Sequence, residues 1–576
     1  MMRPNSSLDN HPQGQNRTGR PVEFNSQALA AWLDELPLTN IDYSGDAVLA
    51  VLREMNEQQG LSSVERFRML EQLRPTAYML SQQAAERYLH DPAFPLPAPL
   101  ERHADRGPAL SSELGRGYRL AMASEDSLSS PASGEDSRAL IIDRALEAYA
   151  TTLLRLREAY RIPPPGFWQD VYGLYQWAET RRLHRLRIAE HNPSSGVTVL
   201  DRFTQIVLFA LSSSHRHRPG KIRQIYELLG TFANKAQIRA TSVLNEQNAL
   251  FCLDLGTDVP PQRIDTLNGS KNDRQRFAFT HALIQFLLKH YEDPANRRLK
   301  GGVLDTSLLK RLLKALGAME RRKSPRNTGD GQCRLVVGLD SLVAVLAGTA
   351  QQNERFVTNA SIVHYKGIGW LTVPNHALEG LHSGESTGNI AAADRIRSEL
   401  SIGKALYENK EVVTRDDIWA ANETDIPSAD PEASRLSGHL VNSSARGHCL
   451  LWTNREVASA KVGELVGLGF REGSLHIGVI RWLRQATNAD LTLGVELLSP
   501  KADVVKVNFI GERESGRNAL LLPSNAGLQQ TAGLLISPSQ HDTGNVMVTT
   551  GSGVAKTYRL GKLLESTPSF QYFSLI

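Results

Sequence analysis

The sequence lacks several features that would assign it to a specialised class of protein. It has only three cysteines in 576 residues, and Cys252, Cys333 and Cys449 are far apart. Three scattered cysteines make neither a disulfide framework nor a zinc site, and they are typical of a reducing compartment. The polar N-terminus has no apolar core of the kind found in signal peptides, and no run of about 18 uncharged apolar residues occurs. These absences predict a cytoplasmic protein without a membrane span.

A strong excess of one charge is also missing. The 65 basic and 61 acidic residues leave a net charge of +4. A binding face for nucleic acid needs a clear excess of lysine and arginine, so this balance does not favour nucleic acid as a partner.

Motifs of the common catalytic and metal-binding classes are absent from the sequence. There is no Walker loop, no nucleophile elbow and no dinucleotide-binding fingerprint. His281 and His290 are nine residues apart, which is not a zinc spacing. The two histidines of "SSSHRHRPGK" (212–221) have no third ligand nearby, which favours a solvated loop over a metal site. We therefore expect a non-enzymatic protein without a metal; an enzyme in the motif-free region 330–375 is the remaining alternative.

The first half of the sequence has the periodicity of helices. In "SSVERFRMLEQL", Ser62 and Glu65 have the spacing of a capping box, and Pro75 is expected to end or kink the helix that starts there. Trp168 and Tyr175 belong to an aromatic stripe at helical spacing, which we interpret as buried core rather than a base-stacking platform. Helix-then-break segments of this kind resemble a tetratricopeptide-like array, although no strict repeat register is present.

The pattern changes to short strands from about residue 430. Segments such as "RGHCLLW", "SLHIGVIRWLRQ" and "LTLGVELLSP", with glycines at the breaks, indicate a small barrel or sandwich. The sequence therefore predicts a multidomain α+β protein in which an N-terminal all-α, repeat-like region precedes an antiparallel β-barrel and a β-rich tail. The predicted parts are a disordered N-terminus (1–26), a helical block (27–91), a linker (92–137), a helical scaffold (138–330), a mixed segment and linker (331–427), the barrel (428–510) and a β-rich extension (511–576).

The turn between the first two strands of the predicted barrel contains a candidate binding motif. It reads N-S-S-A-R-G, from Asn442 to Gly447. An asparagine here can accept backbone N–H bonds, the Ser444 hydroxyl can donate to a guanine edge, and a glycine allows positive φ or the close approach of a ligand. The same residue types also suit an ordinary hairpin.

Together with the strands that follow, this turn resembles the PilZ domain, a bacterial family best known for binding cyclic di-GMP. Asn442, Ser444 and Gly447 match the family's second signature, which is Asp or Asn, any residue, Ser, any two residues, Gly. The resemblance covers residues 435–500. It implies an antiparallel barrel, a signalling role and cyclic di-GMP as the candidate ligand.

The family's first signature is a pair of arginines separated by three residues, on the segment before the barrel, where guanidinium groups grip phosphates. Directly upstream of the turn, Arg415 has no second arginine at that spacing and lies in a segment rich in carboxylates. Arg446 within the turn, or Arg481 and Arg484 on the later strand, would substitute, and a solvated strand face is the alternative for Arg481 and Arg484. The basic cluster "ERRKSPR" (320–326) is interpreted as a charged helix end rather than a contact for phosphate. The ligand set implied by the resemblance is Arg415, Asn442, Ser444, Arg446, Gly447 and Arg481.

Two functions are compatible with these observations. In the first, the barrel is a cyclic di-GMP receptor, and ligand binding shifts the linker at about 410–434 and alters how the helical region contacts an unidentified protein partner. In the second, the protein is an adaptor with a degenerate barrel that does not bind the nucleotide, and the helical array is its working surface.

Overall fold

The computed structural model divides into two compact units. The first comprises Met1–Pro92, Ala98–Ser214 and Pro219–Ala318, and the second comprises Ala93–Pro97, His215–Arg218 and Met319–Ile576. The structure describes residues 23–576 except for the segments 124–134, 189–196, 241–249, 265–271, 294–297, 300–301, 304, 318–326, 329–330, 348–356, 362–436, 445, 453–459, 471–474, 486–489, 510–515, 525–530, 539–543 and 551–554.

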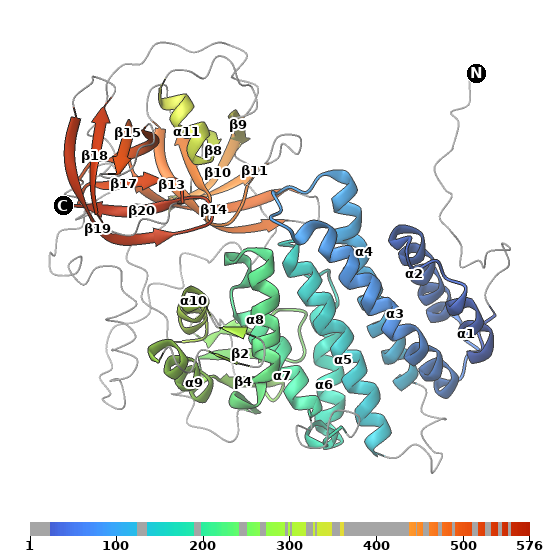
Figure 1. Ribbon diagram of the computed structural model, residues 1–576. Coiled ribbons are helices and arrows are strands. Elements are labelled where there is room, and N and C mark those ends of the chain that lie inside the picture. Colours follow the sequence, from blue (N-terminus) through green and yellow to red (C-terminus); the bar gives the residue numbers. More distant parts are fainter. Residues whose placement is uncertain are drawn as a thin grey trace, which may run out of the picture. The chain divides into compact units, whose positions relative to one another are not determined.

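The first unit is built mainly of helices, which Figure 1 shows side by side from α2 to α6. The helices are α1 (Ser26–Asp34), α2 (Ile41–Glu57), α3 (Ser63–Leu89), α4 (Ala98–Ala123), α5 (Glu135–Glu158), α6 (Phe167–Thr180), α7 (Val199–Leu211), α8 (Pro219–Thr231), α9 (His281–Glu292) and α10 (Thr306–Leu316). Short 3₁₀ turns occur at Leu183–Arg185, Ser214–Arg216 and Ala233–Lys235. None of the helices in the part of the chain that the structure describes is long and apolar enough to cross a membrane.

A small antiparallel sheet accompanies these helices. Its strands are β1 (Gln237–Ala240), β2 (Phe251–Asp254), β3 (Gln262–Arg263) and β4 (Gln275–Phe279), in the order β1-β4-β2-β3, and β5 (Arg298–Leu299) pairs with β6 (Gly302–Val303). Phe251, Cys252 and Leu253 are all buried, as in a strand covered on both faces. The helical region predicted from the sequence therefore also contains a sheet.

The predicted aromatic core is confirmed. Trp168 and Tyr175 are buried, and the ring of Tyr175 stacks on Phe203 with 3.9 Å between centroids. The predicted capping box forms only in part. The Ser62 side chain accepts from the Glu65 amide, but the Glu65 carboxylate instead accepts from the amide and hydroxyl of Ser26, and these bonds lower its pKa.

One helix continues where the sequence predicts an end or a kink, and another continues through a predicted linker. Helix α3 runs through Pro75, and α4 contains Pro108 and fills much of the segment 92–137 that was expected to be a linker. An interior proline removes a helical hydrogen bond and costs about 3 kcal/mol. Both helices bury apolar side chains on either side of the proline, and this packing offsets the cost. These side chains are Leu73 and Ala77 around Pro75, and Ala104 and Leu110 around Pro108.

The second unit contains two closed rings of antiparallel strands. The first ring has the order β8-β10-β11-β14-β13-β12, and β8 also pairs with both β10 and β12, which closes it. Its strands are β8 (Gln332–Val337), β10 (Ser437–Ser444), β11 (Gly447–Trp452), β12 (Leu465–Gly469), β13 (Leu475–Gln485) and β14 (Leu491–Ser499). Strands β7 (Asn327–Thr328) and β9 (Val357–Ser361) pair with the ring, and α11 (Leu339–Leu346) follows β8. The ring thus takes its first strand from the segment expected to be mixed.

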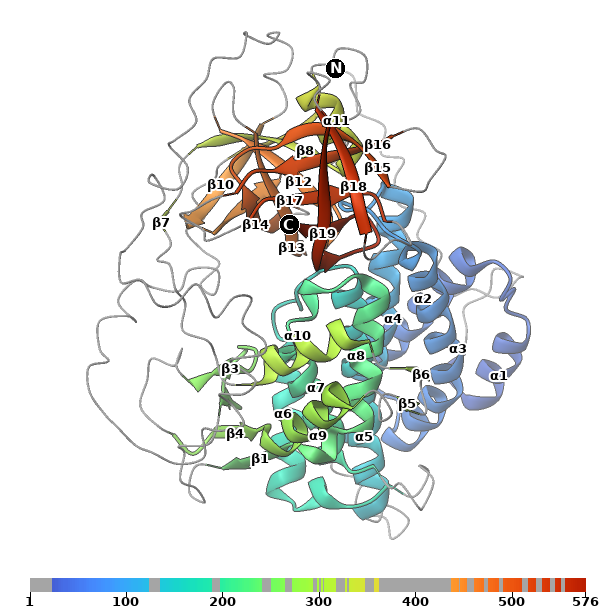
Figure 2. The same ribbon diagram turned by 60° about the vertical axis from the view of Figure 1, so that its left-hand side comes forward.

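The second ring is a closed barrel in the order β15-β16-β17-β20-β19-β18. Figure 2 shows its strands β15 to β19 gathered in the C-terminal part of the chain. Its strands are β15 (Asp503–Phe509), β16 (Arg517–Leu522), β17 (Gly533–Ile536), β18 (Gly544–Thr550), β19 (Ala555–Ser566) and β20 (Gln571–Leu575). Side chains such as Val507, Leu534 and Phe573 fill its interior. The β-rich tail predicted from the sequence is therefore a barrel with its own core.

Candidate functional site

The predicted signature turn is a tight hairpin between β10 and β11. Ser444 lies opposite Gly447 in the antiparallel register, and the Ser444 hydroxyl donates to the Gly447 carbonyl at 3.1 Å. Asn442 lies opposite Cys449, after an irregularity in the register that follows Leu440. The hydroxyl therefore closes the turn, and the asparagine comes directly after the irregularity.

The turn is held against β14 by its backbone. Gly447 has no positive φ, but a Cβ built at this position would be only 2.3 Å from the Val495 carbonyl oxygen. The glycine is therefore needed because β14 approaches the turn closely. Of the two reasons that the sequence suggested for a glycine, positive φ and close approach, the second holds. Arg446 is exposed, and its carbonyl accepts from the Leu497 amide at 3.0 Å.

Arg481 takes part in an ionic cluster near this turn. Its Nε donates to Glu496 at 2.6 Å, while its two Nη atoms donate to Glu565, with an Nη2–Oε2 distance of 2.8 Å. Glu496 lies opposite Gly447 in the β11–β14 register. Burial by itself would lower the pKa of Arg481, but the bonds and charges of Glu565 and Glu496 outweigh it and raise the pKa. The guanidinium is thus committed to two carboxylates, and a solvated strand face was the wrong alternative for this residue.

Arg484 also departs from the solvated face expected for it. Its guanidinium lies over the Trp482 ring at 5.6 Å, and Nη2 contacts His215 Nε2 at 3.3 Å. Burial lowers the pKa of Arg484 to about 10. The contact with His215 also shows that the segment 212–221 is not a solvated loop. In the histidine-containing segment 212–221, which was expected to be a solvated loop, Arg218 donates to the Val462 carbonyl and to Ser569 Oγ, both at 3.0 Å.

The structure identifies a neighbour of the signature strand that the sequence interpretation missed. Strand β7 pairs with β10, so that Thr328 lies opposite Asn442 and Asn327 lies opposite Ser443. The sequence immediately before Asn327 reads R-K-S-P-R, from Arg322 to Arg326. This is the arginine spacing of the first PilZ signature, on the segment before the first barrel strand. Both arginines, like Arg415, lie outside the described residues.

The spacing of these arginines is a weak signal by itself. The same spacing occurs at Arg102 and Arg106, at Arg157 and Arg161, and at Arg181 and Arg185 in the helical region, and at Arg513 and Arg517 in the β-rich extension. What distinguishes the pair at 322 and 326 is its position before β8, the first strand of the ring. Taking "CRLVVGL" as the first barrel strand would have made the pair a candidate from the sequence.

No group of histidine, cysteine, aspartate or glutamate residues that could hold a metal occurs among the residues that the structure describes.

Comparisons with known proteins agree with this geometry. The model of the family "Cyclic-di-GMP receptor FimW, N-terminal domain" matches residues 27–242, and that of "Cyclic-di-GMP receptor FimW, middle PilZ domain" matches residues 250–503. The cyclic-di-GMP receptor FimW of Pseudomonas aeruginosa is 25% identical over 566 residues, which cover 94% of this chain and 89% of that protein. No solved structure matches the chain. The chain thus carries a PilZ domain, matched over residues 250–503, behind an N-terminal region that is matched over residues 27–242.

Proposed function

We propose that the chain is a non-enzymatic signalling protein of PilZ type, which binds cyclic di-GMP at the hairpin of β10 and β11. Asn442, Ser444 and Gly447 match the family signature, and a relative of nearly full length is described as a cyclic-di-GMP receptor. We place the protein in the cytoplasm, where its three cysteines would stay reduced.

The observation that carries this proposal is the pairing of β7 with β10. Arg326 directly precedes Asn327, and Asn327 lies opposite Ser443 of the signature strand. Consecutive Cα atoms are about 3.8 Å apart, so Arg326 is bonded to a residue, Asn327, that pairs directly with the signature strand β10. This connectivity makes Arg322 and Arg326 better candidates for the phosphate contacts than Arg415 or Arg481.

The residue types of the proposed site fit the chemistry of the ligand. Two guanidinium groups can grip the two phosphates through paired charge-assisted hydrogen bonds and can stack on guanine. The exposed Arg446 adds a third cation beside the turn. The Asn442 amide can both donate to and accept from a guanine edge, and the Ser444 hydroxyl, whose proton goes to the Gly447 carbonyl, can still accept.

Signalling requires that the ligand favours one arrangement of the protein over another. We propose that the helical region presents the surface that an unidentified protein partner contacts. The alternative function, an adaptor that does not bind the nucleotide, was based on the absence of an arginine pair directly before the turn. Arg322 and Arg326 supply an arginine pair before β8 instead, so this reason for the adaptor no longer applies.

Calorimetric titration of the full chain with cyclic di-GMP tests the proposal. Replacing Arg322 and Arg326 together by alanine should weaken binding at least about 100-fold, because each lost charge-assisted bond is worth about 1.5 kcal/mol or more. The matched control replaces Arg181 and Arg185, which have the same spacing and are both exposed. An unmodified protein that gives no binding heat at millimolar nucleotide would leave the adaptor as the function.

A further inference from the structure

The two barrels of the second unit have the same topology. When the six strands of each are numbered in chain order, the first barrel (β8, β10, β11, β12, β13, β14) and the second (β15 to β20) both have the order 1-2-3-6-5-4. In both, strand 4 pairs with strand 1 and closes the ring. A shared strand order with shared closure indicates that residues 503–575 repeat the architecture of the PilZ barrel.

The second barrel lacks the second signature of the family, although Arg513 and Arg517 have the spacing of the first. The signature of the first barrel covers the end of its strand 2, the turn and the first residue of its strand 3. The equivalent strands of the second barrel, β16 and β17, are joined by "PSNAGLQQTA" (523–532). This segment has no Asp or Asn followed by serine and glycine at the signature spacing, so the repeat keeps the fold without the binding turn.

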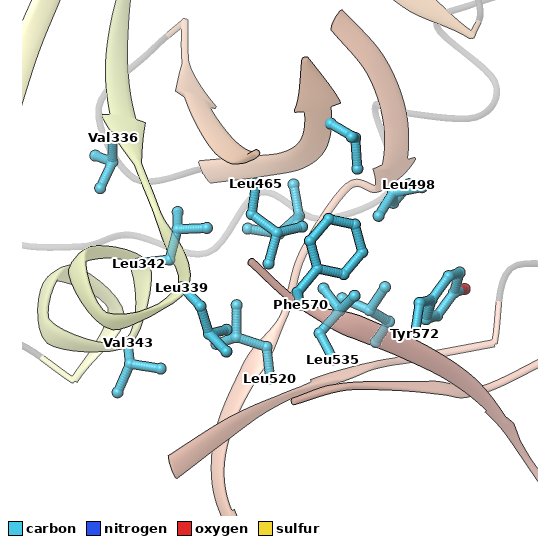
Figure 3. Packing of buried hydrophobic residues seen from close by; sticks show 13 residues of the cluster. Val336, Leu339, Leu342, Val343, Leu465, Leu498, Leu520, Leu535, Phe570 and Tyr572 are labelled. Atoms are coloured by element: carbon cyan, nitrogen blue, oxygen red, sulfur yellow. The ribbon is translucent and has the colours of Figure 1, made fainter. Parts of the chain in front are cut away.

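An apolar core joins the two barrels (Figure 3). Phe570 lies beside Leu465, and Leu520 lies beside Leu339 of α11. The side chains of this cluster are buried, including Val336 and Val479 of the first barrel and Leu535 and Tyr572 of the second. The second barrel is therefore packed firmly on the first.

One polar connection leads from this contact to the signature turn. Arg481 lies where the β13–β14 register shifts between Ile480 and Trp482, and such a bulge re-aims a side chain. It holds Glu565 of β19 on one side and Glu496 of β14 on the other. Glu496 lies opposite Gly447, and the next residue, Leu497, bonds the Arg446 carbonyl. A continuous set of contacts thus runs from the second barrel to the backbone of the turn.

We propose that the C-terminal barrel is a second PilZ-type barrel that has no nucleotide turn and that clamps the first barrel through Arg481. In this arrangement Arg481 holds β14 in the position that the signature turn requires. This inference rests on the proposed function for its ligand readout. Arg481 is then a positioning residue rather than a ligand contact. Arginine is required because one fork must reach two carboxylates, which the point charge of lysine cannot do.

The two roles of Arg481 predict opposite effects of one substitution. Glu565→Gln keeps Arg481 but weakens its hold on the second barrel. A ligand-contacting arginine would become more available and binding would tighten or stay the same. A positioning arginine would lose its anchor, and cyclic di-GMP affinity would fall about five-fold or more.

The experiment measures affinity by calorimetry and backbone hydrogen exchange by mass spectrometry in the full chain. Glu565→Gln should weaken affinity and speed exchange of the Leu497 amide even without ligand. The matched control is Glu179→Gln, which weakens a bidentate pair with Arg276 in the first unit and should change neither. Arg481→Lys should behave like Glu565→Gln.

Unchanged or tighter binding by Glu565→Gln in a chain that otherwise binds overturns the clamp alone. Absence of binding by the unmodified chain overturns the proposed function, and the exchange of Leu497 then decides the clamp. Faster exchange in Glu565→Gln supports it, and unchanged exchange overturns it.

Discussion

Ser443 of the signature strand lies opposite Asn327, the residue that directly follows Arg326. This pairing joins the arginine-containing segment to the turn, and it uses backbone rather than side chains. Asn327 and Thr328 are both exposed, so their side chains contribute little packing. The proposed site therefore depends on the β7–β10 backbone pairing.

A double substitution of Asn327 and Thr328 by proline should lower cyclic di-GMP affinity about ten-fold. The loss of one backbone hydrogen bond is worth about 1 kcal/mol, and proline also fixes φ away from strand values. The matched control replaces both residues by alanine, which keeps the backbone donors. Calorimetry should find affinity close to that of the unmodified chain for the alanine variant. Equal affinities for all three proteins would show that this pairing does not position the arginines.

Gly447→Ala should destabilise the second unit by about 1–3 kcal/mol, because the added Cβ would meet the Val495 carbonyl oxygen at 2.3 Å. Gly173→Ala is the control, since nothing lies within 4 Å of its Cβ and it is an exposed position inside α6. That change should stabilise the first unit by about 0.5–1 kcal/mol. Urea denaturation of each variant measures both effects, and a Gly447→Ala protein as stable as the original would contradict the close approach of β14.

Asp258→Ala should destabilise the first unit by about 1–2 kcal/mol, because Asp258 accepts from the backbone amides of Trp168 and Gln169 at 2.9 and 3.2 Å and caps the start of α6. Asp34→Ala removes an exposed carboxylate at the end of α1 and serves as the control. Thermal unfolding followed by circular dichroism should separate the two variants by a few degrees. Coincident transitions would argue against the cap.

His439 makes the stability of the barrel dependent on pH. Burial in β10 lowers the pKa of its imidazole to about 4, against about 6.5 in an unfolded chain. Between these values the unfolded state binds more protons, so this contribution is complete above about pH 6.5 and is lost as the pH falls towards 4. The loss should be on the order of 1 kcal/mol, because the ring keeps some contact with solvent.

His439→Gln tests this dependence, because glutamine cannot take up the proton. Denaturation curves at pH 7 and pH 5 should show a smaller loss of stability in the variant than in the unmodified chain. Parallel losses in the two proteins would assign the pH dependence to other groups.

Much of the local structure could be predicted from the sequence. The aromatic stripe of α6, the strands from β10 to β14 and the signature turn all depend on periodicity or spacing within a few residues. Helix α3 does not end at Pro75 and α4 continues through Pro108, since packing against other helices outweighs the local preference of proline. The arginine pair was present in the sequence, but proposing it for the site required knowing that β8, far upstream of β10, is the first strand of the ring.

The sequence by itself determined the helical front, the β-rich back and the Asn442–Gly447 motif, because side-chain periodicity and turn chemistry are local properties. Only the tertiary structure decided that Asn327 pairs with Ser443, that Arg481 holds Glu496 and Glu565, and that the tail closes into a second barrel of the same topology. Strand register and ion pairing join residues that are far apart in the chain. They are selected by burial and by the competing contacts of the whole fold, which no short stretch of sequence contains.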